Sequence, residues 1–337
     1  HIILLSNHHA VLDGWSTPLL FADLWSLYRG EVLPAPYEWR DHLAWLSKQD
    51  RAAALDYWRD HFADDAGSGT LALVKTSSPE EGVGEHIVSL SAEVSTRIER
   101  YARQQGLTAS AVYQGAFMLL LARLGSRSEI TIGVTRSGRS SDHAGIERAV
   151  GLYIQTLPLR REIGLGDDLS EWLRGLQEEQ ARQEEHGHLS LTEIQRCAGM
   201  MGSESLCEAL CVYENYKVAT ESGLIASDIE ITDFKARDAT HYALSLAVIP
   251  GSSTKLRFMY DRSQLDRETV ETVAQRLSFI VETISQSRAD TRIGEITLVD
   301  HEERTQVVST FNDTQREIPT TTLPELFSAQ VAKTPDA

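Results

Sequence analysis

Two adjacent histidines, His8 and His9, precede an aspartate four residues further on, Asp13, and a glycine, Gly14. An imidazole that titrates near neutral pH can accept a proton from an amine or hydroxyl nucleophile. The carboxylate could fix the loop by pairing with an arginine, and the glycine N–H could face a developing oxyanion. The spacing alone is equally consistent with histidines that have no chemical role. A metal site is less favoured, because neighbouring side chains on an extended chain point to opposite faces.

The elements around these residues are expected to hold them at the end of a strand. Residues 2–5 are an apolar run, Ile-Ile-Leu-Leu, which predicts a buried strand. An amphipathic helix is expected to follow, with Ser16 as its cap and Gly30 at its end. The histidines would then lie where rigid elements can direct side chains into a cleft. The apolar face of the helix would consist of Leu20, Leu24 and Leu27.

The composition is that of a globular protein. The chain has 337 residues, of which 42% are hydrophobic, and this length corresponds to about two domains. Its net charge of −17 disfavours nucleic acid and anionic membranes as partners. No apolar run approaches the roughly 18 residues of a membrane span. The three cysteines, Cys197, Cys207 and Cys211, are odd in number and include no CxxC pair, so they indicate reduced thiols of a cytoplasmic protein, without a structural metal.

Strands and helices follow one another without a repeat or a strict βαβ order, which favours α/β lobes over a Rossmann sheet. Helices are expected at 92–105 and at 109–124, the second capped by Thr108 and apolar on nearly all sides, so that it should be central. Two more are expected after Asp168 and Asp266. Strands are expected at 85–90, 129–134, 150–159, 206–213, 228–234, 242–249 and 255–260, the last two joined by a hairpin turn at 250–253.

Several segments resemble one family. The string SNHHAVLDGWS at 6–16 resembles the HHxxxDG signature of the condensation domains of nonribosomal peptide synthetases. The resemblance extends over roughly residues 2–299. Gln155 stands where the family has Asn, and Ser190 where it has Pro. The other segments that resemble the family are the aromatic stretch at 37–45, GVTRSGR at 133–139, VGLYIQTLPLR at 150–160, HLSLTEI at 188–194 and VYENY at 212–216.

The resemblance implies an α/β fold of two chloramphenicol-acetyltransferase-like lobes in a V, with the signature histidines at the cleft between them. Because the chain opens in an apolar run without an initiator Met, it is interpreted as a fragment whose first lobe is incomplete. The first lobe would be represented by 1–70, with the expected internal linker at 64–69, and the second by 71–299. The segment 323–337 resembles the opening of an adenylation domain, and 300–322 would be the linker before it.

The implied reaction is peptide bond formation. The amine of an aminoacyl thioester attacks an acyl or peptidyl thioester, and each is carried on the 4′-phosphopantetheine of a carrier domain. The implied partners are an upstream carrier domain, a downstream carrier domain and an adjacent adenylation domain, and no cofactor or metal binds directly. By the same resemblance, His9 positions or deprotonates the amine, His8 supports the loop, Asp13 is structural and Gly14 lines the site.

Three further residues are candidates for the substrate channel, namely Trp15, Ser137 and Gln155. Trp15 has an alternative role as a packing anchor. The arginines between the second and third expected strands could attract an acidic carrier domain or a phosphate, or could belong to an ordinary solvated loop. These arginines are Arg136, Arg139 and Arg148.

Three alternative functions stay open. An epimerization domain shares the signature, but such domains usually have Ser-Trp-Arg after the glycine with an extra residue, whereas this chain has Trp15-Ser16-Thr17-Pro18. An ester-forming acyltransferase of the same superfamily is disfavoured by the adenylation-like tail. A non-catalytic recruitment module is disfavoured because both histidines, Asp13 and Gly14 are present.

Overall fold

The computed structural model describes residues 2–63, 73, 80–139, 145–200, 205–207, 209–214, 240, 242–315 and 320–335. The chain divides into two compact units, His1–Leu298 and Val299–Ala337. The expected linker at 64–69 and the expected strand at 228–234 lie outside the described residues.

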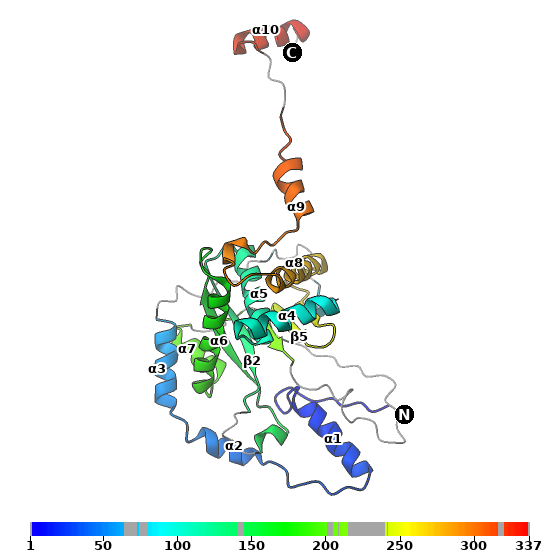
Figure 1. Cartoon of the computed structure of the whole chain (residues 1–337), viewed down its shortest axis with the longest axis vertical. Coiled ribbons are helices and arrows are strands. Elements are labelled where there is room, and N and C mark those ends of the chain that lie inside the picture. The colour runs from blue at the N-terminus through cyan, green and yellow to red at the C-terminus, as the bar shows by residue number, and fades with distance from the viewer. Residues whose placement is uncertain are drawn as a thin grey trace. The chain divides into compact units, whose positions relative to one another are not determined.

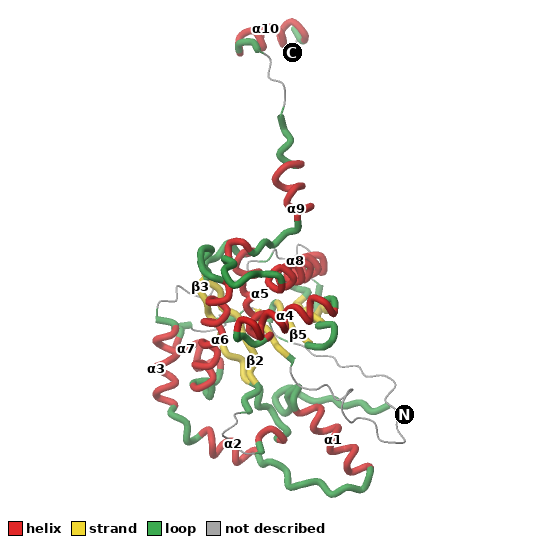
Figure 2. Tube along the Cα trace, in the orientation of Figure 1, coloured by secondary structure: helices red, strands yellow, loops and turns green. Residues whose placement is uncertain are grey.

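Six strands within the described part of the first unit form one mixed sheet (Figure 2). Their order is β1-β6-β5-β4-β2-β3; β4 runs parallel to both β5 and β2, and the other neighbours are antiparallel. This confirms the predicted α/β class and the predicted hairpin between β5 and β6. The strands are β1 (Val83–Ser89), β2 (Glu129–Arg136), β3 (Gln155–Glu162), β4 (Ala209–Tyr213), β5 (Leu244–Ile249) and β6 (Lys255–Asp261).

Short polar side chains begin most of the helices that pack around this sheet. Thr108 and Asp168 each accept a hydrogen bond from a backbone N–H in the first turn that follows them, which satisfies donors without an intrahelical partner. Four helices predicted from these signals are confirmed. The helices of the first unit are α1 (Ser16–Tyr28), α2 (Trp39–Leu46), α3 (Arg51–His61), α4 (Ala92–Gln105), α5 (Ala109–Leu124), α6 (Leu169–Glu185), α7 (Leu191–Cys197) and α8 (Arg267–Ser285), with 3-10 turns at Ile146–Arg148 and Ile293–Glu295.

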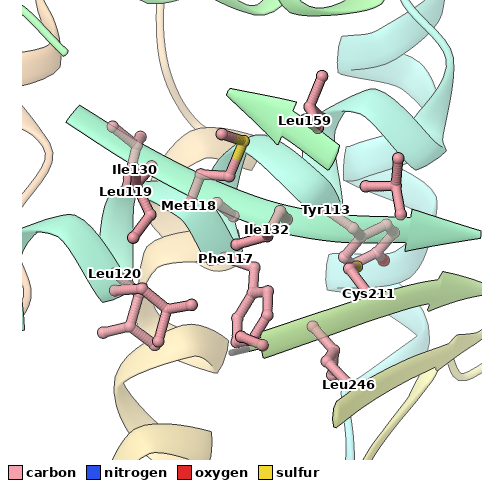
Figure 3. Packing of buried hydrophobic residues seen from close by; sticks show 14 of the residues in the cluster. Tyr113, Phe117, Met118, Leu119, Leu120, Ile130, Ile132, Leu159, Cys211 and Leu246 are labelled. Atoms are coloured by element: carbon pink, nitrogen blue, oxygen red, sulfur yellow. The ribbon is translucent and has the colours of Figure 1, made fainter. Parts of the chain in front are cut away.

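Helix α5 lies at the centre of the core, as its apolar sequence predicts. Twelve of its 16 residues are buried. Figure 3 shows Phe117 of α5 close to the strands that carry Ile132, Cys211 and Leu246. Because apolar side chains surround the helix on nearly every side, it connects the sheet to the outer helices.

Helix α3 belongs to the same core as α5, although the two helices are far apart in the sequence. Its residues Ala54 and Trp58 are fully buried, and both belong to the hydrophobic cluster that contains α5 and α6. The helix packs against α7 (Figure 1). The indole Nε1 of Trp58 donates to the carbonyl oxygen of His186 at 3.0 Å, which ties α3 to the end of α6.

The first residues of the chain do not form the predicted strand. Residues 2–8 have no regular secondary structure, and Ile2 and Leu4 are 95% and 87% exposed. A strand requires a neighbour that binds its backbone, and none of the six described strands pairs with this segment. The predicted apolar face of α1 is also wrong in part: Leu24 and Leu27 are exposed, and Trp25 is the large side chain that is buried.

The second unit contains short helical segments. They are α9 (His301–Thr305), a π-helical turn at Gln306–Thr310 and α10 (Leu323–Lys333). Across the described residues of both units, no single helix is long and apolar enough to cross a membrane, and α4 and α5 meet that test only as a pair bent by 104°.

Candidate functional site

The carboxylate of Asp13 is buried and fully hydrogen-bonded. Its Oδ1 accepts from the backbone N–H of Ser16 at 2.9 Å and from the Ser16 hydroxyl at 2.8 Å. Its Oδ2 accepts from the N–H groups of Tyr153 at 3.0 Å and Ile154 at 3.2 Å. Both oxygens also accept from the guanidinium of Arg139, at 2.8 and 3.1 Å. The Asp13 carboxylate therefore joins the signature loop to two segments more than 120 residues away in sequence.

Burial by itself would raise the pKa of Asp13. The hydrogen bonds from Arg139, Tyr153 and Ser16 favour the charged form more strongly, and the net effect is a pKa below the usual value. The two side chains of the ion pair are 0% and 2% exposed. Asp13 is thus an ionised group of the interior, and Arg139 is its counter-ion.

Arg139 is held on all sides. Its guanidinium donates to the carbonyl oxygens of Ala149 at 3.1 Å and Ser137 at 3.2 Å. It lies 4.7 Å from the ring centroid of Tyr153 and 5.5 Å from that of Trp15. The interpretation of Arg139 as part of an exposed basic run is therefore wrong, because pairing with a buried carboxylate outweighs the tendency of arginine to remain solvated.

The other two arginines of that run differ from Arg139. Arg148 is exposed. Arg136 is partly buried and donates to Oε1 of Gln180 at 3.0 Å, and its burial lowers the pKa of its guanidinium. The three arginines therefore do not form one surface.

Trp15 is fixed by packing. Its indole Nε1 donates to the carbonyl oxygen of Glu147 at 3.0 Å, and its ring lies beside the guanidinium of Arg139. These contacts agree with the alternative role of a packing anchor. Gly14 lies between Trp15 and the buried Asp13 and is partly exposed.

Ser16 is not the cap of α1 but its first residue, and the cap position is held by Trp15, which has no side-chain capping bond. Asp13 supplies that bond instead, since its Oδ1 accepts the N–H of Ser16. The Ser16 hydroxyl lies 2.8 Å from both Asp13 Oδ1 and the carbonyl oxygen of Gly151, which share its one proton, and its oxygen accepts the N–H of Gly151 at 2.9 Å.

The strand predicted at 150–159 begins only at Gln155. Its first residues are used differently: the N–H groups of Gly151, Tyr153 and Ile154 bind Ser16 and Asp13 in place of a neighbouring strand. Backbone donors that already have a side-chain partner cannot join the ladder. These contacts with the Asp13 loop therefore delay the start of β3 to Gln155.

The two histidines lie in the exposed part of the loop. The ring Nδ1 of His8 accepts the backbone N–H of Ala10 at 3.0 Å, so this ring stabilises the turn that carries His9. His9 itself is exposed and has no hydrogen bond within the described part of the chain. Its ring is thus free to take a partner from outside.

Two of the three candidate channel residues lie at the ends of neighbouring strands. Ser137 follows β2, and its Oγ accepts the N–H of Arg139 at 3.3 Å. Gln155 opens β3 opposite Arg136. The structure thus places Trp15 and Ser137 against Arg139, while Gln155 directly follows the segment 153–154 that binds Asp13. His8 and His9 lie in the exposed part of the loop.

An aromatic cluster, which the sequence does not assign to the site, supports this region. The ring of Tyr153 lies 4.9 Å from those of Trp39 and His42, and 6.3 Å from that of Tyr37. The aromatic stretch at 37–45 is therefore the layer behind the segment that binds Asp13. Its composition and its resemblance to the family single out this stretch in the sequence, but nothing local indicates Tyr153 as its partner.

Comparisons with known proteins point to one family. The family described as "Condensation domain" matches residues 1–308. The chain is 34% identical to chondramide synthase cmdD of Chondromyces crocatus over 366 residues, and 31% identical to bacitracin synthase 1 of Bacillus licheniformis over 349 residues. These matches cover 100% and 99% of this chain but only 9% and 6% of those proteins.

Solved structures share the fold. A four-domain nonribosomal peptide synthetase bound to AMP and glycine matches with a TM-score of 0.79 at 15% identity, over 98% of this chain and 27% of the other. The first condensation domain of the calcium-dependent antibiotic synthetase matches with a TM-score of 0.69 at 17% identity, over 87% of this chain and 66% of the other. The predicted condensation-domain fold is thereby confirmed.

Proposed function

Because the chain belongs to the condensation-domain family, we propose that it forms a peptide bond between two thioester substrates in nonribosomal peptide synthesis. The observation that supports this most directly is the anchored loop. Asp13 is held by Arg139 and by the backbone of 153–154, while His9 in the same loop is exposed and has no hydrogen bond to any described residue. A fixed loop that presents an exposed imidazole suits the positioning of an external nucleophile.

In the proposed reaction, the amine nitrogen of the acceptor attacks the carbonyl carbon of the donor thioester. The C–N bond forms, the C–S bond breaks, and the proton lost by the amine reaches the departing thiol. His9 positions the amine or takes its proton, while His8 supports the turn and Asp13 fixes the loop. Gly14, Trp15, Ser137 and Gln155 border the channel.

Proximity is expected to contribute more than the imidazole does. General-base assistance is worth roughly 10²- to 10⁴-fold, whereas holding two reactants together can contribute about 7 to 11 kcal/mol. Thioesters are already activated acyl donors. The loss of His9 should therefore slow the reaction strongly and still leave measurable turnover.

The proposed partners follow from the reaction. Two carrier domains present the substrates on 4′-phosphopantetheine arms, and an adenylation domain loads one of them in the cytoplasm. We assign 323–337 to the start of that adenylation domain and 300–322 to the linker. This assignment is supported by the resemblance of the tail sequence.

The test is product formation by the parent synthetase with two loaded carrier domains, analysed by mass spectrometry. An added peptide bond on the acceptor arm is the expected result. An ester, a product with an inverted stereocentre or unchanged substrates would each refute the proposal, and would favour in turn an acyltransferase, an epimerase or a recruitment module.

A further inference from the structure

The core face of the sheet ends in polar side chains where β2 and β3 approach the signature loop. Along β2, Ile132 and Val134 are fully buried, and the alternation of a strand places Arg136 on the same face. Gln155 lies directly opposite Arg136 in the antiparallel register, so the two side chains share that face. The residue before Gln155 donates its N–H to Asp13 at 3.2 Å. Arg136 and Gln155 therefore border the anchored loop.

Neutral amides surround the guanidinium of Arg136. One of its terminal nitrogens donates to Oε1 of Gln180 in α6 at 3.0 Å, and the Gln180 amide donates in turn to Oε1 of Gln114 in α5. Both glutamines are buried, at 4% and 2% exposure. Gln155 lies close to the chain that follows α6, since a Cβ at Gly187 would be 3.4 Å from its Oε1. These amides solvate the cation without neutralising it.

Arg136 has no ion pair with any described residue, although it is largely withdrawn from water. The exposed carboxylate of Glu184 acts on it only through space, and burial still lowers the pKa of the guanidinium. Its Nε is buried and has no hydrogen-bond partner in the described part of the chain. Elsewhere in the same strand pair, Arg160 of β3 is paired with Glu129 of β2. Because a buried charge is costly without a counter-ion, the end of β2 lacks one negative charge.

We propose that Arg136 binds a carboxylate on the side chain of one of the two substrates and so selects an acidic residue, an inference that rests on the proposed function. A guanidinium matches a carboxylate in both geometry and charge. Gln180 uses one nitrogen of the group, and the partly exposed remainder can be reached from outside. The amide of Gln155, on the same face, can donate to the same carboxylate.

The local cation matters because the chain as a whole repels anions. Its net charge of −17 disfavours the approach of an acidic substrate at most places on the surface. A carboxylate that reached Arg136 would gain a counter-ion and fill the donors that the amides leave open. An uncharged amide of the same shape would gain no such charge pairing. The comparison of an acid with its amide therefore isolates the proposed contact.

The test uses the parent synthetase, with its carrier domains loaded from synthetic aminoacyl-coenzyme A so that the adenylation domain does not select the amino acid. Glutamyl and glutaminyl thioesters are compared, and then aspartyl and asparaginyl thioesters. Each pair is presented on the acceptor arm with a fixed donor, and on the donor arm with a fixed acceptor. On one of the two arms, kcat/KM for the acid should exceed that for its amide at least tenfold, as expected for one charge-assisted contact.

Three variants test the role of the guanidinium. Arg136→Met removes the charge and should bring the ratio of acid to amide close to one. Arg136→Lys keeps the charge without the fork and should retain only part of the preference. Arg103→Met removes an exposed arginine at the end of α4 and should leave the ratio unchanged. Because acid and amide are measured on one preparation, any loss of folded protein cancels from the ratio.

The inference is overturned if neither arm prefers the acid, or if the preference persists in Arg136→Met. Should Arg136→Met fail to fold, an unchanged ratio in Arg136→Lys would overturn it equally. Peptide bonds formed at equal rates from acid and amide would refute the selectivity and leave the proposed function in place. The absence of a peptide bond from every substrate, neutral ones included, would refute the proposed function and this inference with it.

Discussion

Replacing Asp13 by asparagine removes one charge and keeps the shape of the side chain. Both carboxylate oxygens face only donors: the N–H and hydroxyl of Ser16 on one side, the N–H groups of Tyr153 and Ile154 on the other, and Arg139 on both. In either orientation of the amide, its NH2 group must face one of these sets of donors. The substitution therefore leaves an unpaired cation and opposed donors in a buried site.

The cost follows from this burial. Removing one partner of a buried, hydrogen-bonded ion pair costs about 3 to 5 kcal/mol, which is a large part of the roughly 5 to 15 kcal/mol that stabilises a typical domain. The matched control is Asp56→Asn, which breaks the exposed pair with Arg59. This control should cost no more than about 1 kcal/mol.

The assay is urea unfolding of the chain, monitored by circular dichroism, with a double-mutant cycle between Asp13→Asn and Arg139→Met. Methionine can fill the space between the rings of Trp15 and Tyr153 without a charge. Asp13→Asn should therefore cost less in that background, with a coupling energy of about 2 kcal/mol or more. Equal costs for Asp13→Asn and Asp56→Asn, or a coupling near zero, would refute the reasoning.

Three other predictions concern the signature loop and a segment that holds it. His9→Ala should slow condensation by the parent synthetase about 10²- to 10⁴-fold without changing the unfolding midpoint of the chain, because the ring is exposed; an unchanged rate would exclude this ring from the mechanism. The lowered pKa of Asp13 contributes stability that is present above about pH 4 and is lost as the pH falls through the folded-state pKa, so urea unfolding between pH 5 and 2 should show a shallower pH dependence in Asp13→Asn. Gly138 has a φ of +62°, and a Cβ there would lie 1.7 Å from the Tyr153 carbonyl oxygen. Gly138→Ala should therefore destabilise the chain more than Gly106→Ala, which has a φ of +70° and open space around it; equal costs would show that the contact relaxes freely.

The elements that the sequence predicts well are those set by local hydrogen bonds. Helices at 92–105 and 109–124 are found with the predicted bounds, because Thr108 before the second helix and Gly106 after the first act within a turn of their own position. The central place of 109–124 follows from its composition, since a helix that is apolar all round has no face for water. The bounds and the burial of these helices can therefore be predicted without knowledge of distant residues.

The site is predictable only in part, because its contacts are long-range. The Asp13 carboxylate could pair with an arginine, but nothing in the loop identifies Arg139, which lies 126 positions away. The N–H groups of Gly151, Tyr153 and Ile154 are bound to Ser16 and Asp13, so the strand predicted from residue 150 begins only at Gln155. The apolar run at 2–5 fails for the opposite reason: its pattern is that of a strand, and the described sheet offers it no neighbour.

The geometry divides the signature between two kinds of residue, and this division can be tested. Asp13 is in the interior and bound to the backbone of a distant segment, whereas His9 is at the surface and bound to nothing in the described chain. Loss of either side chain should lower condensation, but only loss of Asp13 should also lower the free energy of unfolding. Asp13→Glu keeps the charge and lengthens the side chain by one methylene, which the close contacts with Ser16 and Tyr153 cannot accommodate without displacement. Asp13→Glu is compared with Asp13→Asn and with the unsubstituted chain. If Asp13→Glu had the free energy of unfolding of the unsubstituted chain but no condensation activity, the position of the loop, and not its stability alone, would set the rate.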